Sequence, residues 1–209
     1  MRKVGISILV LLLVGCQSIS TNQSEQALDA IEEVNQSNIV ISNNYVKPLF
    51  SYHLPQNIGL IESNQISSRL RVENVDVVMS LDVSQILSDE EKLINVDNLV
   101  VDESFSIKGR KESLSGHIYL EQLEAGNYLL YMKVSNVFFL AVVSDIEFIN
   151  VVKQIVMVAR TVDVKEKKVV STFSNKETIS YEKEVIELFS ESIPDEGMIK
   201  DIIVEEEDE

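Results

Sequence analysis

The sequence predicts an α+β fold that is rich in β-structure, with its helices concentrated in the C-terminal part. Apolar and polar residues alternate along much of residues 45–135, which is the period of half-buried strands. After residue 144 the apolar residues recur at three- and four-residue spacing instead, which indicates helices. With 209 residues, 45% of them hydrophobic, and only seven Gly and three Pro, the chain is able to bury a core within one domain.

Seven extended segments are predicted in the first part of this domain. The alternation is clearest from Val75 to Val83, where every second side chain is apolar. A helix start or an exposed turn is expected within residues 86–94. A tight turn at residues 124–127 is expected to place Gly126 or Asn127 at a positive φ. The predicted strands cover residues 45–54, 59–63, 65–72, 75–83, 105–111, 114–120 and 128–135.

A second group of elements follows from residue 137. Residues 137–143 are a continuous run of β-branched, aromatic and other apolar residues, which predicts a buried central strand. Charged residues interrupt the hydrophobic region too often for a membrane span. Ser144 or Asp145 is expected to cap a helix. Its inner face is predicted to carry Phe148, Ile149, Val152, Ile155, Val156 and Ala159. A charged turn at 165–168, a return strand at 169–173 and a helix at 181–192, stopped by Pro194, complete the domain.

The first sixteen residues have the layout of a secretory signal. Arg2 and Lys3 form a positive end, and the apolar run after them is too short to span a bilayer stably. The run ends in Leu13, Val14, Gly15 and Cys16. This ending resembles the lipobox of bacterial lipoproteins. The resemblance implies that residues 1–15 are removed, and that the thiol of Cys16 carries diacylglycerol. A further acyl chain such as palmitate then joins the new amino terminus, so that the protein is held on a membrane of the cell envelope.

The alternative is an ordinary cleaved signal, or an N-terminal membrane anchor, that happens to contain a cysteine. By resemblance to enterobacterial lipoproteins, Gln17 rather than Asp after the cysteine implies the outer membrane in a Gram-negative host. In any other host the protein would lie on the outer face of the cell membrane. Cys16 is the sole cysteine of the sequence, which excludes an internal disulfide framework.

Charge and composition divide the remainder of the chain. Removal of the signal takes the formal net charge from −16 to −18, so an anionic bilayer is expected to repel the body. Residues 16–44, rich in Ser, Asn and Gln, are expected to be a polar tether, with at most a short fraying helix near residues 24–34. Residues 45–194 form the predicted globular domain. Residues 195–209 form an acidic tail, whose expected role is solubility, with loose cation binding or a basic partner as alternatives.

Motifs that carry chemistry are absent from the sequence. It contains no glycine-rich phosphate loop, nucleophile elbow or pair of histidines at metal-ligand spacing. His53 and His117 lie in predicted strands and are expected to be structural or interface residues. We therefore expect no catalytic residues, no metal and no cofactor beyond the lipid on Cys16. The negative charge argues against a nucleic-acid partner.

One aromatic stretch is a candidate for docking a partner. Tyr45, Phe50 and Tyr52 lie close to two prolines where the tether enters the domain. A strip of this kind is able to bind a partner strand or peptide, and core packing is the alternative explanation.

These features together predict a membrane-anchored lipoprotein that acts through contacts with other envelope proteins. An assembly or stability component of an envelope machine, such as a secretion or pilus apparatus, is the form of this hypothesis that we favour. A lipoprotein that binds an extracytoplasmic ligand or peptide is the first alternative, and it predicts an apolar pocket with convergent polar groups. An envelope hydrolase is the second, and it predicts a buried base beside a nucleophile or a metal.

Overall fold

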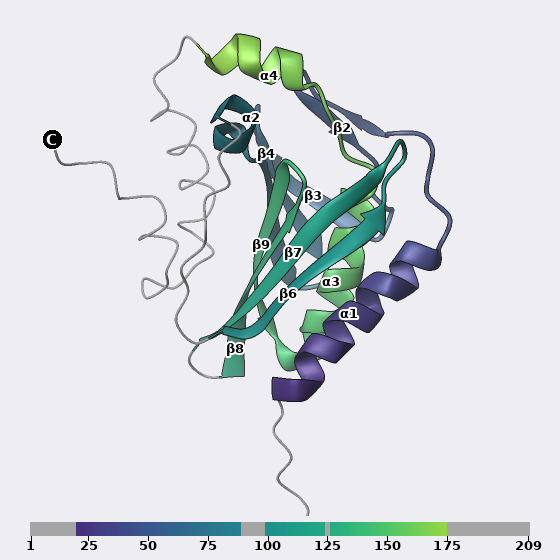
Figure 1. Ribbon diagram of the computed structural model, residues 1–209, viewed down its shortest axis with the longest axis vertical. Coiled ribbons are helices and arrows are strands. Elements are labelled where there is room, and N and C mark those ends of the chain that lie inside the picture. The colour runs from purple at the N-terminus through teal and green to yellow at the C-terminus, as the bar shows by residue number, and fades with distance from the viewer. Residues whose placement is uncertain (1–19, 89–98, 124–125, 175–209) are drawn as a thin grey trace, which may run out of the picture.

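A seven-stranded antiparallel sheet dominates the computed structural model, which describes residues 20–88, 99–123 and 126–174 (Figure 1). The strands lie in the order β3-β4-β5-β9-β8-β7-β6. Most neighbours in the sheet are also neighbours in sequence, so hairpins build it, and β5 and β9 join its two halves. The strands are β3 Ile58–Ser63, β4 Ser67–Val72, β5 Val75–Leu81, β6 Leu99–Lys108, β7 Ser113–Gln122, β8 Asn127–Val134 and β9 Val137–Ser144.

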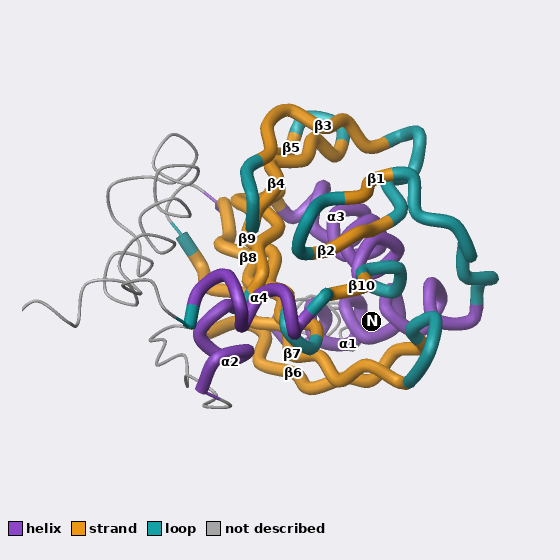
Figure 2. The backbone as a smooth tube through the Cα atoms, turned by 90° about the horizontal axis from the view of Figure 1, so that it is seen from above, coloured by secondary structure: helices purple, strands orange, loops and turns teal. Residues whose placement is uncertain are grey.

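Two helices, α1 (Ser20–Gln36) and α3 (Asp145–Ala159), lie together on the concave face of this sheet, which curls around them (Figure 2). The inner face of the central strand β9 is made by every second residue, as the period of a strand requires. On α3 the buried positions recur at three- and four-residue spacing, as the sequence predicts. The inner residues of β9 are Val137, Phe139, Ala141 and Val143, and those of α3 are Phe148, Val151, Val152, Ile155, Val156, Val158 and Ala159. Of the residues predicted for this face, Ile149 is only partly buried.

The start of α3 is fixed by its first turn. Ser144 precedes the helix. The backbone N–H of Ser144 (3.1 Å) and its hydroxyl (2.6 Å) both donate hydrogen bonds to the carboxylate of Glu147. These two hydrogen bonds lower the pKa of Glu147. The prediction that this helix begins at Ser144 or Asp145 is therefore confirmed.

Helix α1 corrects the expectation of a polar tether over residues 16–44. From Ser20 to Gln36 the chain is a regular helix, and its apolar face is part of the core, with Ala27 0% and Ile31 3% exposed. The polar composition of this segment comes from the outer face of an amphipathic helix. The isolated segment is too polar to form a stable helix, and tertiary packing of its apolar face stabilises it. The folded body therefore begins about 25 residues earlier than residue 45, the start predicted from composition.

A buried guanidinium joins α1 to the rest of the domain. Arg160, just after α3, is 3% exposed and donates hydrogen bonds to carbonyl oxygens at the end of α1 and to the carbonyl of Lys108 in β6 (3.0 Å). A cation is favourable at this point because the last carbonyls of a helix carry its negative dipole end. The acceptors on the α1 side are Val34 O, Asn35 O (3.2 Å), Ser37 O (3.0 Å) and Ser37 Oγ (3.0 Å).

A small three-stranded sheet and two short helices complete the described chain. Strands β1 (Tyr45–Val46), β2 (Phe50–Tyr52) and β10 (Asp163–Val164) pair antiparallel in the order β1-β2-β10. Helices α2 (Val83–Ser88) and α4 (Glu166–Phe173) pack together near the end of the large sheet (Figure 2). None of the helices within the described ranges is both long enough and apolar enough to cross a membrane.

The predicted α+β class with a β-rich body is confirmed, and the prediction for residues 165–173 is wrong. Residues 166–168, predicted as part of a charged turn, form the first turn of α4. Residues 169–173 form the end of α4 rather than a return strand, because Val169 and Phe173 are buried one helical turn apart while Val170 is 40% exposed. Gly126 has a φ of 77°, as the predicted turn requires. The predicted helix at 181–192 and the acidic tail at 195–209 lie outside the described residues.

Candidate functional site

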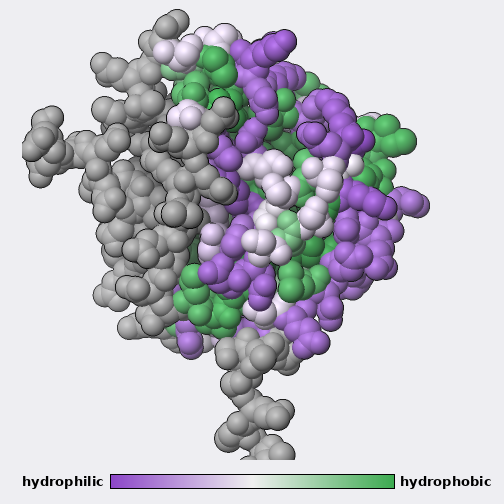
Figure 3. All heavy atoms as spheres, in the orientation of Figure 1, coloured by the Kyte–Doolittle hydropathy of each residue, from purple (hydrophilic) through white to green (hydrophobic). Residues whose placement is uncertain are grey.

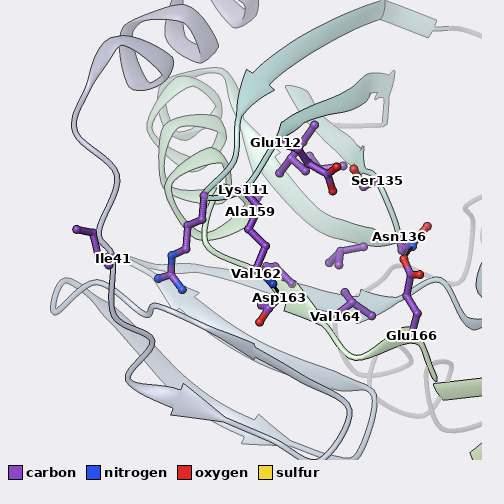
Figure 4. A pocket seen from close by; sticks show the side chains of 14 residues that line it. Ile41, Lys111, Glu112, Ser135, Asn136, Ala159, Val162, Asp163, Val164 and Glu166 are labelled. Atoms are coloured by element: carbon purple, nitrogen blue, oxygen red, sulfur yellow. Dashed lines mark hydrogen bonds and ion pairs between the residues drawn. The ribbon is translucent and has the colours of Figure 1, made fainter. Parts of the chain in front are cut away.

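The principal candidate site is a cleft of about 530 Å³ at the end of the sheet where α3 ends. Three segments that are distant in sequence meet there: the β6–β7 hairpin tip (109–112), the β8–β9 turn (135–136) and the stretch from the end of α3 into α4 (159–166) (Figure 4). We call it the end cleft. Its volume lies within the range of small-molecule and peptide sites.

The floor of the end cleft is apolar and its edge is charged. Leu114, Val134 and Val137, at the ends of three strands, line the floor. Lys111 and Asp163 face each other from the hairpin tip and from β10, with Nζ and Oδ1 2.7 Å apart. This arrangement provides apolar burial together with hydrogen-bonding groups that orient a ligand.

Short contacts between neighbouring segments hold the β8–β9 turn that borders the cleft. Ser135 has a φ of 50°, and its N–H donates to the carbonyl of Ser115 (2.9 Å). The carbonyl of Asn136 accepts from the N–H of Asp82 (2.9 Å), and the side-chain amide of Asn136 donates to Glu166 at the start of α4 (2.8 Å). The turn is therefore a fixed wall of the cleft.

Arg110 has unused hydrogen-bonding capacity beside the cleft. Its Nε donates to the carbonyl of Val40 (2.8 Å), whereas its buried Nη2 has no hydrogen-bond partner within the described ranges. Desolvation lowers the pKa of this guanidinium, and the charge of Asp163 acts in the opposite direction. A buried donor without an acceptor is costly, so Arg110 favours a ligand that supplies one.

The predicted docking residues Tyr45, Phe50 and Tyr52 lie elsewhere, in the small sheet. The Tyr52 ring stacks between the other two rings, with centroids 5.5 Å from Tyr45 and 5.8 Å from Phe50. Phe50 is 1% exposed and Tyr52 is 0% exposed, so neither presents a surface to a partner. The docking prediction is wrong for these two residues, because the small sheet folds their side chains into the core.

Lys47 covers the same aromatic cluster from its side. Its Nζ lies 4.8 Å from the centre of the Phe50 ring and donates to the carbonyls of Asn64 (3.0 Å) and Ser67 (2.7 Å). Burial lowers the pKa of Lys47 to about 8. The lysine holds the β3–β4 turn against the small sheet.

His117 lies on the outer face of the sheet in a hydrogen-bonded row across β6 and β7. Its Nδ1 is 3.0 Å from Ser104 Oγ, its Nε2 is 2.5 Å from Asp102 Oδ1, and its ring stacks on Tyr119 at 4.1 Å. The order Ser–His–Asp is that of a nucleophile, base and orienting acid. However, the row lies on the outer face of two strands that pair with each other, and Asp102 is 56% exposed. A cross-strand stabilising role accounts for these contacts.

His53 has a structural environment. Its Nδ1 lies 3.1 Å from the carbonyl of Ser42, and its backbone N–H donates to Thr161 Oγ1 (2.9 Å). Cys16 lies outside the described residues. Within the described ranges no three His, Cys, Asp or Glu residues are grouped so that they could hold a metal ion. The sequence matches no protein-family model, and it has no significant similarity to a curated protein.

Sequence reasoning did not find the end cleft. Its charged residues belong to one hairpin tip, to a two-residue strand and to the start of α4, and none of these has a motif. The one available signal was the sequence Gly109, Arg110, Lys111, Glu112 between two alternating segments, which is typical of an exposed charged turn.

Proposed function

We propose that this protein is a lipid-anchored envelope lipoprotein that acts through contacts with other proteins and not as an enzyme, as an assembly or stability component of an envelope machine such as a secretion or pilus apparatus. The observation that carries the proposal is the sequence Leu13, Val14, Gly15, Cys16 at the end of a signal-like segment, followed closely by a folded body. The proposed location is the outer membrane of a Gram-negative host, or otherwise the outer face of the cell membrane.

The start of α1 limits how far the body stands from the membrane. Ser20 is four positions after Cys16, and a fully extended chain spans at most about 14 Å over four residue steps. The side-chain amide of Gln23 donates to Asp145 (2.8 Å), so the first turns of α1 and α3 lie at the same end of the molecule. With Cys16 lipidated, this end is next to the bilayer.

The end cleft then faces away from the membrane. It borders the C-terminal end of α3, and the 15 residues of this helix span about 22 Å. Figure 1 shows α1 and α3 beginning at the lower end of the molecule and α4 at the opposite end. A cleft in this position is accessible to a soluble partner or to a complex in the envelope.

The anchor is tested by replacing Cys16 with Ser in the full-length protein. The expected result is loss of labelling by a fatty-acid analogue and release of the protein from the membrane fraction. Gln17→Asn serves as the matched control and should keep both properties. Unchanged labelling of Cys16→Ser would overturn the lipoprotein proposal.

The second candidate, a lipoprotein that binds a small extracytoplasmic ligand or peptide, is favoured by the volume and apolar floor of the end cleft. The two functions predict different crosslinking partners for the protein. Crosslinking in intact membranes should capture a stoichiometric envelope protein in the first case and leave the protein alone in the second.

A further inference from the structure

The open edge of the small sheet lies in the end cleft. Strand β10 is the last strand in the order β1-β2-β10, so one of its sides is not paired with a strand of that sheet. Asp163 and Val164 both line the cleft. Successive side chains of a strand point to opposite faces, so a cleft that touches both residues runs along the edge of the strand.

The hydrogen-bond register shows which backbone groups face this edge. The N–H of Lys165 donates to the carbonyl of Leu49 (2.8 Å), and Asp163 is opposite Ser51. In an antiparallel pair, hydrogen-bonded positions alternate with positions that point outward. Val164 therefore directs its N–H and its carbonyl away from β2, toward the open edge.

We propose that the end cleft binds an extended segment of a partner polypeptide, which pairs with the edge of β10 through the N–H and carbonyl of Val164. Alternate apolar side chains of the segment lie on the floor formed by Leu114, Val134 and Val137, and one carboxylate of the segment is bound by Arg110. This inference rests on the proposed function, because it names the surface and the chemistry through which the protein makes its contacts.

Three observations favour an extended peptide over a compact ligand. An edge strand provides main-chain hydrogen bonds that only another extended backbone satisfies in register. The floor is formed by strand ends and is apolar, which suits the alternating side chains of a strand. The Nη2 of Arg110 has no acceptor within the described ranges, and a carboxylate of the segment would supply one.

The test uses the full chain, lipidated and in nanodiscs, and a fluorescent capped heptapeptide that alternates valine and threonine around a central glutamate. The same peptide with the two residues that flank the glutamate replaced by proline is the probe control, since proline removes N–H groups needed for pairing. Anisotropy should show saturable binding of the first peptide and none of the second. Binding should also slow hydrogen exchange at the amide of Val164.

Two variants separate the backbone contact from the side chain. Val164→Pro removes the outward N–H and leaves the hydrogen bonds to β2 in place, and it should weaken binding about tenfold, as expected for the loss of one hydrogen bond. Val164→Ala keeps the N–H and should change affinity less than threefold. Arg110→Gln should weaken binding of the glutamate peptide, and a glutamine version of the peptide should remove this difference. Equal thermal unfolding of the variants shows that they are folded.

Other outcomes overturn the proposal. The proposal is wrong if the peptide shows no saturable binding, if the proline control binds equally well, or if a folded Val164→Pro variant binds with unchanged affinity. A concentration-dependent dimer that Val164→Pro abolishes would assign the edge to a second copy of this chain. Tighter peptide binding after deletion of residues 175–209 would assign it to the protein's own C-terminal segment. If labelling of Cys16 persists while the peptide does not bind, the cleft inference alone has failed.

Discussion

Replacement of Arg160 by Met should detach α1 from the domain. The guanidinium is 3% exposed and makes five hydrogen bonds, four of them to carbonyl oxygens. The carbonyl of Val34 keeps the N–H of Ser37 as a donor (3.0 Å), so the cost falls on the other three carbonyls, those of Asn35, Ser37 and Lys108. At about 1 kcal/mol for each carbonyl deprived of its donor, the free energy of unfolding should fall by about 3 kcal/mol. For a domain of about 150 residues this corresponds to a decrease in Tm of about 6 to 12 °C.

The matched control is Lys153→Met, which removes another basic residue that joins α3 to α1. Lys153 Nζ lies 2.6 Å from Glu33 Oε2, but the pair is at the surface, and Glu33 is 69% exposed. Its loss should cost less than about 1 kcal/mol. Urea denaturation followed by circular dichroism measures both values, and hydrogen exchange should show α1 amides exposed in Arg160→Met alone. Equal destabilisation by the two variants would refute the argument that the buried guanidinium holds α1.

Two further predictions concern other buried contacts. Burial lowers the pKa of Lys47 to about 8, so between about pH 8 and pH 10.5 the unfolded chain binds more protons than the folded one, and stability should rise with pH in that window. Because Lys47 is only partly buried, a gain of about 1 kcal/mol is expected in urea titrations, and Lys47→Met should abolish it; an unchanged slope would contradict the assignment. Gly116→Ala should destabilise by about 1 to 3 kcal/mol, since a Cβ there would lie 2.3 Å from the ring of Phe105. Phe105→Leu in the same chain should recover part of the loss, and strictly additive effects of the two changes would argue against that contact.

The periodicity of the sequence was sufficient for most of the large sheet and for α3. Strand β9 and helix α3 are adjacent in the chain, and each has a long apolar pattern whose period belongs to one type of structure. The strand prediction for residues 169–173 was wrong because a five-residue apolar pattern does not distinguish a strand from a helical turn. The packing of Val169 and Phe173 on one side of α4 distinguishes them.

The sequence by itself determined the fold class, the strand-rich body and the resemblance of residues 13–16 to a lipobox, because these depend on neighbours along the chain. Tertiary structure alone decided that α1 belongs to the core, since this polar segment is stable as a helix when its apolar face packs in the core and Arg160, 124 residues beyond Gln36, binds its last carbonyls. It also decided the end cleft. Arg110 and Asp163 belong to elements that no local pattern relates, and only the closing of the sheet around α3 brings them to one edge.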